Sequence, residues 1–317
     1  MNKVWLTGDA VVDLIPEGDH SYLKCPGGAP ANVAVGIARL AGDCGFFGRV
    51  GADPMGRFMK ETLGNENVDV SYLKLDPQQR TSTVIIELDD HGERSFTFMV
   101  KPSADQFIQA EDIPRFQPNE WIHCCSIALA NEPSRSTTLF AMRAMKSAGG
   151  FVSFDPNLRE EVWKQPQEIR SVVMSAIQLA DVVKFSEEEL LYLTKTSRID
   201  EGLVALSHYA LPLVVVTLGE KGALVLFQGE QTLVGSISVQ MVDTTGAGDA
   251  FVSGLLAMLS QHNQWQQSSI VQQAVRWGNV CGALATTQKG AMSALPNQAQ
   301  LLDCLHSDNV KPTLDKK

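Results

Sequence analysis

Short apolar runs alternate along this chain with segments of helical periodicity, and this alternation constrains the fold more than any other feature. The runs are VWLTG (4–8), CGFFGRV (44–50), WIHCCSI (121–127), FVSFD (151–155), DVVKF (181–185) and LVVVTLG (213–219). Helical patterns occupy 30–42, 54–67, 134–150, 187–195, 247–261 and 265–287. Strands that alternate with helices form a parallel sheet covered on both faces. The sequence therefore predicts an α/β protein whose central sheet is mostly parallel and flanked by helices.

The segment from Ser71 to Lys101 interrupts this alternation, because it reads as successive strands without a helix. VSYLKL is followed by TSTVIIEL and ERSFTFMV, and the turn 89-DDHGE-93 joins the last two as a hairpin. Both hairpin strands alternate in part, as expected for a sheet with one covered face. Such an insertion is either a flap over a site or an ordinary edge hairpin. The pattern alone does not decide between them.

Composition and charge exclude several classes of protein. The chain has 317 residues and a net charge of −10, and its basic residues are scattered. It therefore lacks the clustered basic residues that are typical of nucleic-acid-binding proteins. No stretch approaches the roughly 18 consecutive apolar residues of a membrane span. The N-terminus lacks the segments of a signal peptide. The six cysteines show no CxxC spacing and are expected to be reduced. We expect a cytoplasmic protein that binds neither nucleic acid nor membrane.

The stretch 242-VDTTGAGDAFVSGLL-256 places glycines and a carboxylate at the start of a predicted helix. Helix N-termini present unpaired N–H groups and a positive dipole end. Gly246 and Gly248 let an anion approach that backbone closely. A phosphate site gains from Asp249 only if the carboxylate takes a proton from an attacking hydroxyl. A simple helix cap explains TTGAGD equally well when the stretch is taken alone.

Two other phosphate-binding motifs are absent. A dinucleotide fingerprint needs GxGxxG between the first strand and its helix, whereas GAGDAF lies late in the chain and lacks the third glycine. The chain contains no GxxxxGK[ST] stretch, which excludes the P-loop.

Four motifs in matching order resemble the ribokinase-like (PfkB) carbohydrate kinases. They are 8-GDAVVD-13, 27-GGAPANVA-34, 217-TLGEKG-222 and the stretch 242–256, and the predicted hairpin falls where this family carries its lid. The resemblance implies a three-layer ribokinase-like kinase domain over 1–317, with a β lid inserted at about 81–100. It also implies ATP-dependent phosphorylation of a sugar hydroxyl, with Mg²⁺ at the phosphates and K⁺ as an activating cation.

The resemblance assigns roles to individual residues. Asp249 is the implied base, the amides of Gly246, Ala247 and Gly248 are the implied anion donors, and Arg159 lies near the sugar or the transferred phosphate. The implied sugar contacts are Asp9, Asp13, Gly28, Asn32, Phe96, Phe98, Asn157, Arg159 and Asp249. The implied nucleotide contacts are Lys184, Ser186, Glu189, Thr217, Gly219, Gly222, Gly246, Gly248 and Asn279.

The metal sites depart from the family pattern at two positions. Ser186 replaces the asparagine of the NxxE element in 186-SEEE-189, while Glu189 keeps its place and is expected to reach Mg²⁺ through water. The implied monovalent-cation site comprises Asp243, Thr245, Ala285, Gln288, Gly290 and Ala294. Most of its ligands are backbone carbonyls, and Ala294 loses a side-chain oxygen found in ribokinases.

The lid sequence GERSFTF, together with 102-PSAD-105 and 155-DPNLR-159, resembles the fructokinase branch of the family. The stretches TTGAGDAFV and 289-KGAM-292 are shared with bacterial aminoimidazole riboside kinases. We expect phosphorylation of D-fructose to fructose 6-phosphate, with the riboside as the alternative substrate. A non-catalytic sugar or nucleotide sensor is the alternative of another class. The lid hairpin could also pair with its copy in a homodimer.

Overall fold

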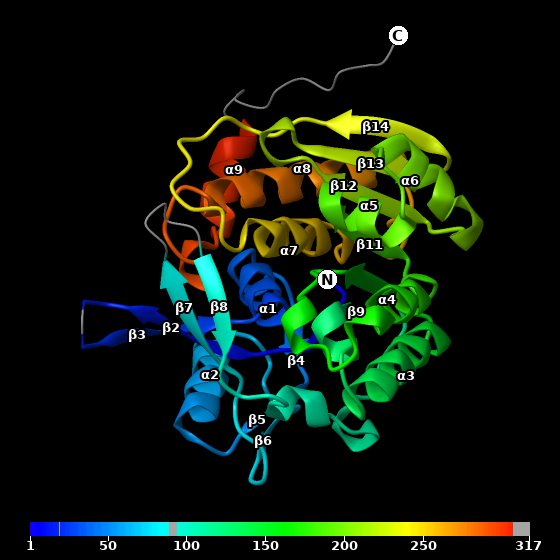
Figure 1. Ribbon diagram of the computed structural model, residues 1–317. Coiled ribbons are helices and arrows are strands. Elements are labelled where there is room, and N and C mark those ends of the chain that lie inside the picture. The colour runs from blue at the N-terminus through cyan, green and yellow to red at the C-terminus, as the bar shows by residue number, and fades with distance from the viewer. Residues whose placement is uncertain (19, 89–93, 307–317) are drawn as a thin grey trace.

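The computed structural model describes residues 1–18, 20–88 and 94–306, and in this part of the chain the main element is an eight-stranded sheet (Figure 1). Its order is β14-β13-β12-β11-β10-β9-β1-β4. The strands are β1 (Val4–Thr7), β4 (Cys44–Phe46), β9 (Trp121–Cys125), β10 (Phe151–Asp155), β11 (Val182–Ser186), β12 (Leu213–Thr217), β13 (Ala223–Phe227) and β14 (Glu230–Val234). Neighbours from β4 to β12 pair in parallel, and β13 and β14 extend the sheet antiparallel. The predicted mostly parallel α/β sheet is confirmed.

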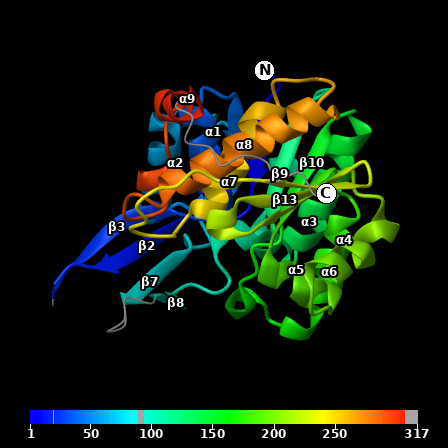
Figure 2. The same cartoon turned by 90° about the horizontal axis from the view of Figure 1, so that it is seen from above.

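Helices cover both faces of this sheet, so the fold has the three layers that the sequence predicts (Figure 2). One side carries α1 (Ala29–Arg39), α2 (Pro54–Asn65), α7 (Ala247–Leu259), α8 (Ser268–Ala285) and α9 (Gln298–His306). The other carries α3 (Ser134–Ser147), α4 (Ile169–Ile177), α5 (Glu187–Thr194) and α6 (Ile199–Leu206). Successive side chains of a strand point to opposite faces. Val215 therefore packs into the core under α7 and α8, and Val214 and Val216 pack into the core under α5 and α6.

A separate four-stranded sheet forms the lid and projects from the main body (Figures 1 and 2). Its order is β3-β2-β7-β8, with β2 (Val11–Pro16), β3 (Tyr22–Gly27), β7 (Thr83–Leu88) and β8 (Arg94–Phe98). The predicted hairpin is confirmed as the antiparallel pair β7–β8, although its turn at 89–93 lies outside the described residues. The sequence did not reveal that β2 pairs with β7 and so brings β2 and β3 into the lid.

The apolar run CGFFGRV forms two strands and not one. β4 ends at Phe46, and β5 (Gly48–Gly51) begins at Gly48, whose φ of 148° is disfavoured for other residues. β5 pairs with β6 (Leu73–Asp76) in a small sheet of its own, so the predicted strand VSYLKL is not part of the lid. Continuous hydrophobicity shows that a segment is buried, but it does not show which sheet the segment joins.

The topology brings the chemistry to one edge. Because β1, β9, β10, β11 and β12 run parallel, their carboxyl ends meet at the edge where α/β proteins bind ligands. Asp9 follows β1, Asp155 ends β10, and Lys184 lies in β11, two residues before its end. Within the described residues, every helix is too short or too polar to cross a lipid bilayer.

Candidate active site

The turn that starts α7 requires a glycine. Gly246 has a φ of 76°, and a Cβ there would lie 2.9 Å from the Cα atom of Ala291. The amide of Ala247, one of the three expected anion donors, already donates to the carbonyl of Thr244 at 3.2 Å. The amides of Gly246 and Gly248, together with the helix dipole, are therefore the groups that an anion would meet at this helix start.

Most residues expected to contact the sugar line one pocket of about 410 Å³. The residues expected from the sequence that line it are Asp9, Asp13, Gly28, Asn32, Phe98, Asn157, Arg159, Lys184, Ser186, Glu189, Thr245, Gly246, Gly248 and Asp249. Phe98 is half-buried in the lid wall, Arg159 is exposed, and the side chain of Phe96 lies outside the described residues. Segments that are far apart in the chain, from the lid to α7, therefore build this pocket.

Asp249 lies in the first turn of α7, where its carboxylate faces Asn32 of α1. The side-chain amide of Asn32 donates to Oδ2 of Asp249 at 2.8 Å. Burial raises the pKa of Asp249 to about 6, although the hydrogen bond from Asn32 and the nearby cations of Lys184 and Arg159 oppose this rise. A carboxylate with this pKa is largely ionised at neutral pH and is still basic enough to accept a proton.

Asp9 is the second buried carboxylate of the pocket. Burial raises its pKa to about 7, and the negative charges of Asp105 and Asp249 add to the rise. Its Oδ1 atom has no hydrogen-bond partner in the described part of the protein. Gly28 permits close packing here, because a Cβ would lie 2.4 Å from the carbonyl oxygen of Asp9. Asp9 thus presents an unsatisfied acceptor, which a sugar hydroxyl can satisfy.

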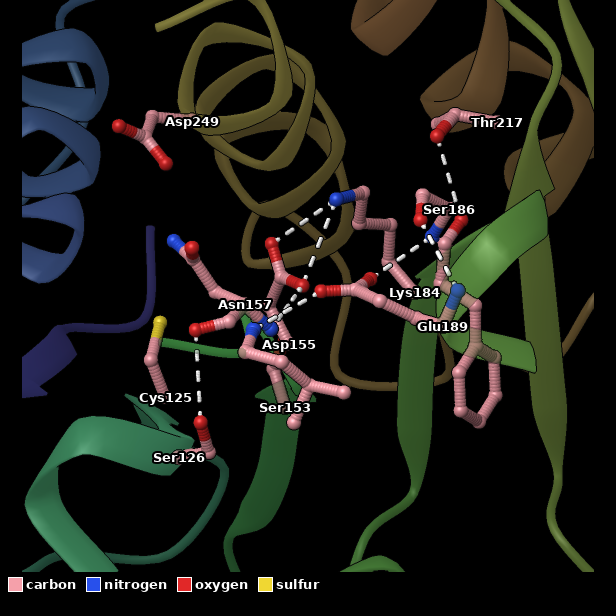
Figure 3. Close-up of polar contacts among 12 residues, drawn as sticks. Cys125, Ser126, Ser153, Asp155, Asn157, Lys184, Ser186, Glu189, Thr217 and Asp249 are labelled. Carbon is pink, nitrogen blue, oxygen red and sulfur yellow. Dashed lines mark hydrogen bonds and ion pairs between the residues drawn. The ribbon is translucent and has the colours of Figure 1, made fainter. Parts of the chain in front are cut away.

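A buried cation faces the start of α7. Lys184 forms an ion pair with Asp155 at 3.1 Å, and a Cβ on Gly248 would lie 3.3 Å from its Nζ atom. Burial alone would lower the pKa of this ammonium, but the carboxylates of Asp155 and Glu189 hold it above its ordinary value. Figure 3 shows the contacts of this ammonium with both carboxylate oxygens of Asp155. The charge is fixed where a phosphate would meet the helix.

Ser186 and Glu189 form a capping box at the start of α5 (Figure 3). The hydroxyl of Ser186 accepts a hydrogen bond from the backbone amide of Glu189 at 3.2 Å. Oε2 of Glu189 accepts one from the backbone amide of Ser186 at 2.9 Å. The other oxygen of Glu189 accepts the amide of Leu158 at 3.0 Å. Burial and the charge of Asp155 raise the pKa of Glu189. Both oxygens are thus engaged, so a metal contact through ordered water fits this residue better than direct coordination.

A second pocket of about 420 Å³ lies on the other side of the α7 start. The residues that line it include the expected nucleotide contacts Thr217, Gly219, Gly222, Gly248 and Asn279. The amide of Asn279 donates to the carbonyls of Val234 at 2.8 Å and Gly235 at 3.2 Å, so this side chain positions the end of β14. Thr244 and Gly248 line both pockets. Two ligands would therefore meet at the turn that carries Asp249.

The model of the pfkB family of carbohydrate kinases matches residues 1–298. The chain belongs to this family. A fructokinase from Vibrio alginolyticus is 60% identical over 95% of this chain and 98% of its own length. An aminoimidazole riboside kinase from Salmonella typhimurium is 42% identical and covers 100% of this chain and 99% of its own. The protein is therefore an enzyme, a carbohydrate kinase.

Solved structures agree with this assignment. The crystal structure of a fructokinase from Vibrio cholerae O395, bound to fructose, ADP and a calcium ion, superposes with a TM-score of 0.92. It is 65% identical and the match covers 96% of this chain and 98% of that one. A double-mutant form of the same fructokinase, with fructose, ADP and a potassium ion, is 64% identical with the same TM-score and coverage.

In the loop expected to bind a monovalent cation, the carboxylate of Asp243 accepts hydrogen bonds from two separate segments. Asp243 Oδ1 accepts the amide of Thr245 at 3.0 Å and its hydroxyl at 2.7 Å, and Oδ2 accepts the amide of Gly290 at 2.9 Å. Ala285 ends α8, Gln288 follows it, and Ala294 ends the 3₁₀ helix η8 (Met292–Ala294). No group of three acidic, histidine or cysteine side chains in the described residues could hold a metal. Backbone carbonyls suit a weakly bound monovalent cation at such a loop.

The sequence reasoning missed Asp155. This carboxylate is buried at the end of β10, pairs with Lys184, and accepts the amide of Asn157 at 3.2 Å. It also raises the pKa of Asp249 through its charge. The available signal was its position as the last residue of a predicted strand, directly before the residues that were assigned to the sugar.

Proposed function

We propose that this kinase is a fructokinase that transfers the terminal phosphoryl group of ATP to the 6-hydroxyl of D-fructose. The observation that carries this proposal is the meeting of the two pockets at Gly248, beside the buried carboxylate of Asp249. The fructokinase relatives, which bind fructose and ADP in the Vibrio cholerae structures, support fructose as the sugar and ATP as the phosphoryl donor.

The proposed chemistry follows from the positions of the side chains. Asp249 accepts the proton of the 6-hydroxyl while the sugar oxygen forms a bond to the terminal phosphorus, and the bond from that phosphorus to ADP breaks. The amides of Gly246 and Gly248 donate to the transferring group, and the ammonium of Lys184 offsets its charge. Asp9, Asp13, Asn32 and Asn157 orient the sugar, with Phe98 and the lid excluding water.

Metal ions have defined places in this proposal. Mg²⁺ would offset the charge of the ATP phosphates, and Glu189 is the residue that would hold it, through an ordered water molecule. The loop around Asp243 binds K⁺, which the potassium ion in a Vibrio cholerae fructokinase structure supports. We expect kcat to fall when KCl is replaced by choline chloride, and Asp243→Ala to lose this dependence. An equal response to both salts in the two proteins would contradict the cation site.

The test is an ADP-release assay with Mg·ATP and a panel of fructose, aminoimidazole riboside, ribose and mannose. We expect the highest kcat/KM with fructose. Asp249→Ala should keep fructose affinity, measured by calorimetry, and lose roughly two decades or more of turnover. Near-normal turnover in that variant would eliminate the base assignment, and binding without turnover in the wild type would indicate a sensor.

Aminoimidazole riboside is the second candidate substrate, because the riboside kinase relative matches the whole chain.

We also propose a cytoplasmic location, because the cytoplasm supplies the ATP that the kinase uses as its phosphoryl donor. Pairing of two copies through the lid is supported by exposed Tyr22 and Leu23 on the edge strand β3. Light scattering measures this directly, and a monomer at micromolar concentration would contradict the pairing.

A further inference from the structure

Arg39 is the last residue of α1, and its guanidinium joins three segments that are far apart in the chain. The Nε and Nη2 atoms donate to the two carboxylate oxygens of Glu66, at 2.9 Å and 2.6 Å. The Nη1 atom donates to the main-chain carbonyls of Met292 at 3.0 Å and of Leu295 at 2.9 Å. Both charged side chains are half-buried, and the hydrogen bonds from Arg39 lower the pKa of Glu66. This two-point ion pair holds the guanidinium in one orientation, with Nη1 directed at the two carbonyls.

The segment 290–295, which the guanidinium holds near its end, is also held at its start. The amide of Gly290 donates to Oδ2 of Asp243 at 2.9 Å. Ala291 lies between these two attachments and packs against the start of α7, because a Cβ on Gly246 would lie 2.9 Å from the Cα atom of Ala291. A shift of this segment would therefore change the support of the turn whose amides face the phosphoryl group.

The hydrogen bonds of this segment also decide which of its carbonyls are left for a cation. The hydroxyl of Ser293 donates to the carbonyl of Lys289 at 3.1 Å, and the amide of Ala294 donates to that of Ala291 at 3.2 Å. The guanidinium takes two further carbonyls. Within the described part of the chain, the carbonyls of Gly290 and Ala294 accept no hydrogen bond. Both belong to the expected cation ligands, so the segment presents them with their lone pairs free.

The helix that carries this guanidinium also supports the catalytic carboxylate. Asn32 and Arg39 are seven residues apart in α1, so they lie on the same face of the helix. The side chain of Asn32 donates to Asp249 at 2.8 Å. Between them, a Cβ on Gly36 would collide with the side chain of Ser253 in α7, which shows how closely the two helices pack. One helix therefore holds the base at its start and the cation segment at its end.

We propose that Arg39, oriented by Glu66, is a positioning residue for K⁺, because it fixes the segment 290–295 with its free carbonyls in place. Through the contact of Ala291 with Gly246, the same hydrogen bonds support the turn that faces the phosphoryl group. Loss of the guanidinium therefore weakens K⁺ binding and lowers kcat together, while the contacts to the sugar remain. This inference rests on the proposed function, because the cation site belongs to it.

The test measures the KCl concentration that gives half-maximal kcat for ADP release with fructose, with choline chloride keeping the ionic strength constant. Arg39→Met should raise this concentration roughly 10-fold, the effect of one hydrogen bond from a charged donor. Glu66→Gln leaves the guanidinium without its ionic partner, and Arg39→Lys keeps a cation near the carbonyls, so each should give a smaller rise. The acid limb of the pH profile, which depends on Asp249, should stay in place in all three variants.

Arg135→Met is the matched control. The guanidinium of Arg135 donates to the main-chain carbonyls of Leu129 at 2.8 Å and Ala130 at 3.2 Å, and it pairs with Glu168 at 3.0 Å. The variant therefore removes the same kinds of contact, but from α3, which covers the opposite face of the sheet from α1. It should lower the melting temperature, as Arg39→Met does, and leave the response to KCl unchanged.

Thermal melting with fructose and ADP, in KCl or in choline chloride, repeats the comparison without turnover. KCl should raise the melting temperature of the wild type and of Arg135→Met more than that of Arg39→Met. If Arg39→Met does not fold, Glu66→Gln and Arg39→Lys provide the same comparison.

An equal response to KCl in the wild type and the Arg39 and Glu66 variants would overturn the positioning role, as would an equal loss of response in Arg135→Met. A wild type that does not respond to KCl in either assay would overturn the cation site itself. Failure of the proposed function is a separate outcome, namely absence of ADP release with fructose, and the melting comparison would still decide the role of Arg39.

Discussion

The hydrogen bond between Asn32 and Asp249 should set the pH range of this kinase. Asp249 must be ionised to accept a proton, so activity is present above its pKa of about 6 and falls as the pH drops through that value. The amide of Asn32 favours the ionised form at a distance of 2.8 Å. Asn32→Ala removes this stabilisation and should therefore raise the pKa of Asp249.

The size of the shift follows from the charge on the acceptor. A hydrogen bond to a charged group contributes about 1.5–3 kcal/mol, and one pKa unit corresponds to about 1.4 kcal/mol. The bond is buried, so a shift of about one to two units is expected, to between about 7 and 8. The acid limb of the kcat/KM profile should move upward by that amount, apart from any loss of plateau activity through weaker sugar binding.

The assay is ADP release from pH 5 to 9.5 at fixed ionic strength, with wild type, Asn32→Ala and Ser253→Ala. Ser253 is the control, because its hydroxyl donates to the main-chain carbonyl of Asp249 at 2.8 Å and not to the carboxylate. Asp9, whose pKa is about 7, also titrates in this range. The shift of the acid limb in Asn32→Ala is therefore measured relative to the wild type and compared with the shift in Ser253→Ala. An acid limb that stays in place or moves downward in Asn32→Ala would refute the reasoning.

Two further predictions concern stability and the start of α7. Lys184→Met should destabilise the protein by about 3–5 kcal/mol, because it leaves the carboxylate of Asp155 without its ion-pair partner, and adding Asp155→Asn should restore most of the lost stability. Urea unfolding of the single and double variants measures the free energy of unfolding. Additive losses in the double variant would show that the two residues do not stabilise each other. Gly246→Ala should lower stability more than Gly229→Ala, since both glycines have positive φ, which costs an alanine about 1–2 kcal/mol, but only Gly246 lies against Ala291. Equal unfolding midpoints would show that this contact is unimportant.

Periodicity and turn residues were enough to predict the layers of this fold, because local burial patterns reflect which elements lie inside. They did not predict which sheet an apolar segment would join. CGFFGRV is divided at Gly48 between two sheets, and β2 leaves the main body to pair with β7. Strand pairing is a choice between distant partners, and the sequence of one strand contains little information about it.

The sequence by itself determined the turn at residues 246–249, since glycines, a carboxylate and an apolar helix follow one another within a few residues there. Only the tertiary structure decided the charges and the spaces around that turn. The ion pair of Lys184 with Asp155 and the hydrogen bond from the amide of Asn32 to Asp249 join elements that are far apart in the chain. Burial raises the pKa of Asp249 and of Asp9, and burial exists only once the layers have packed together.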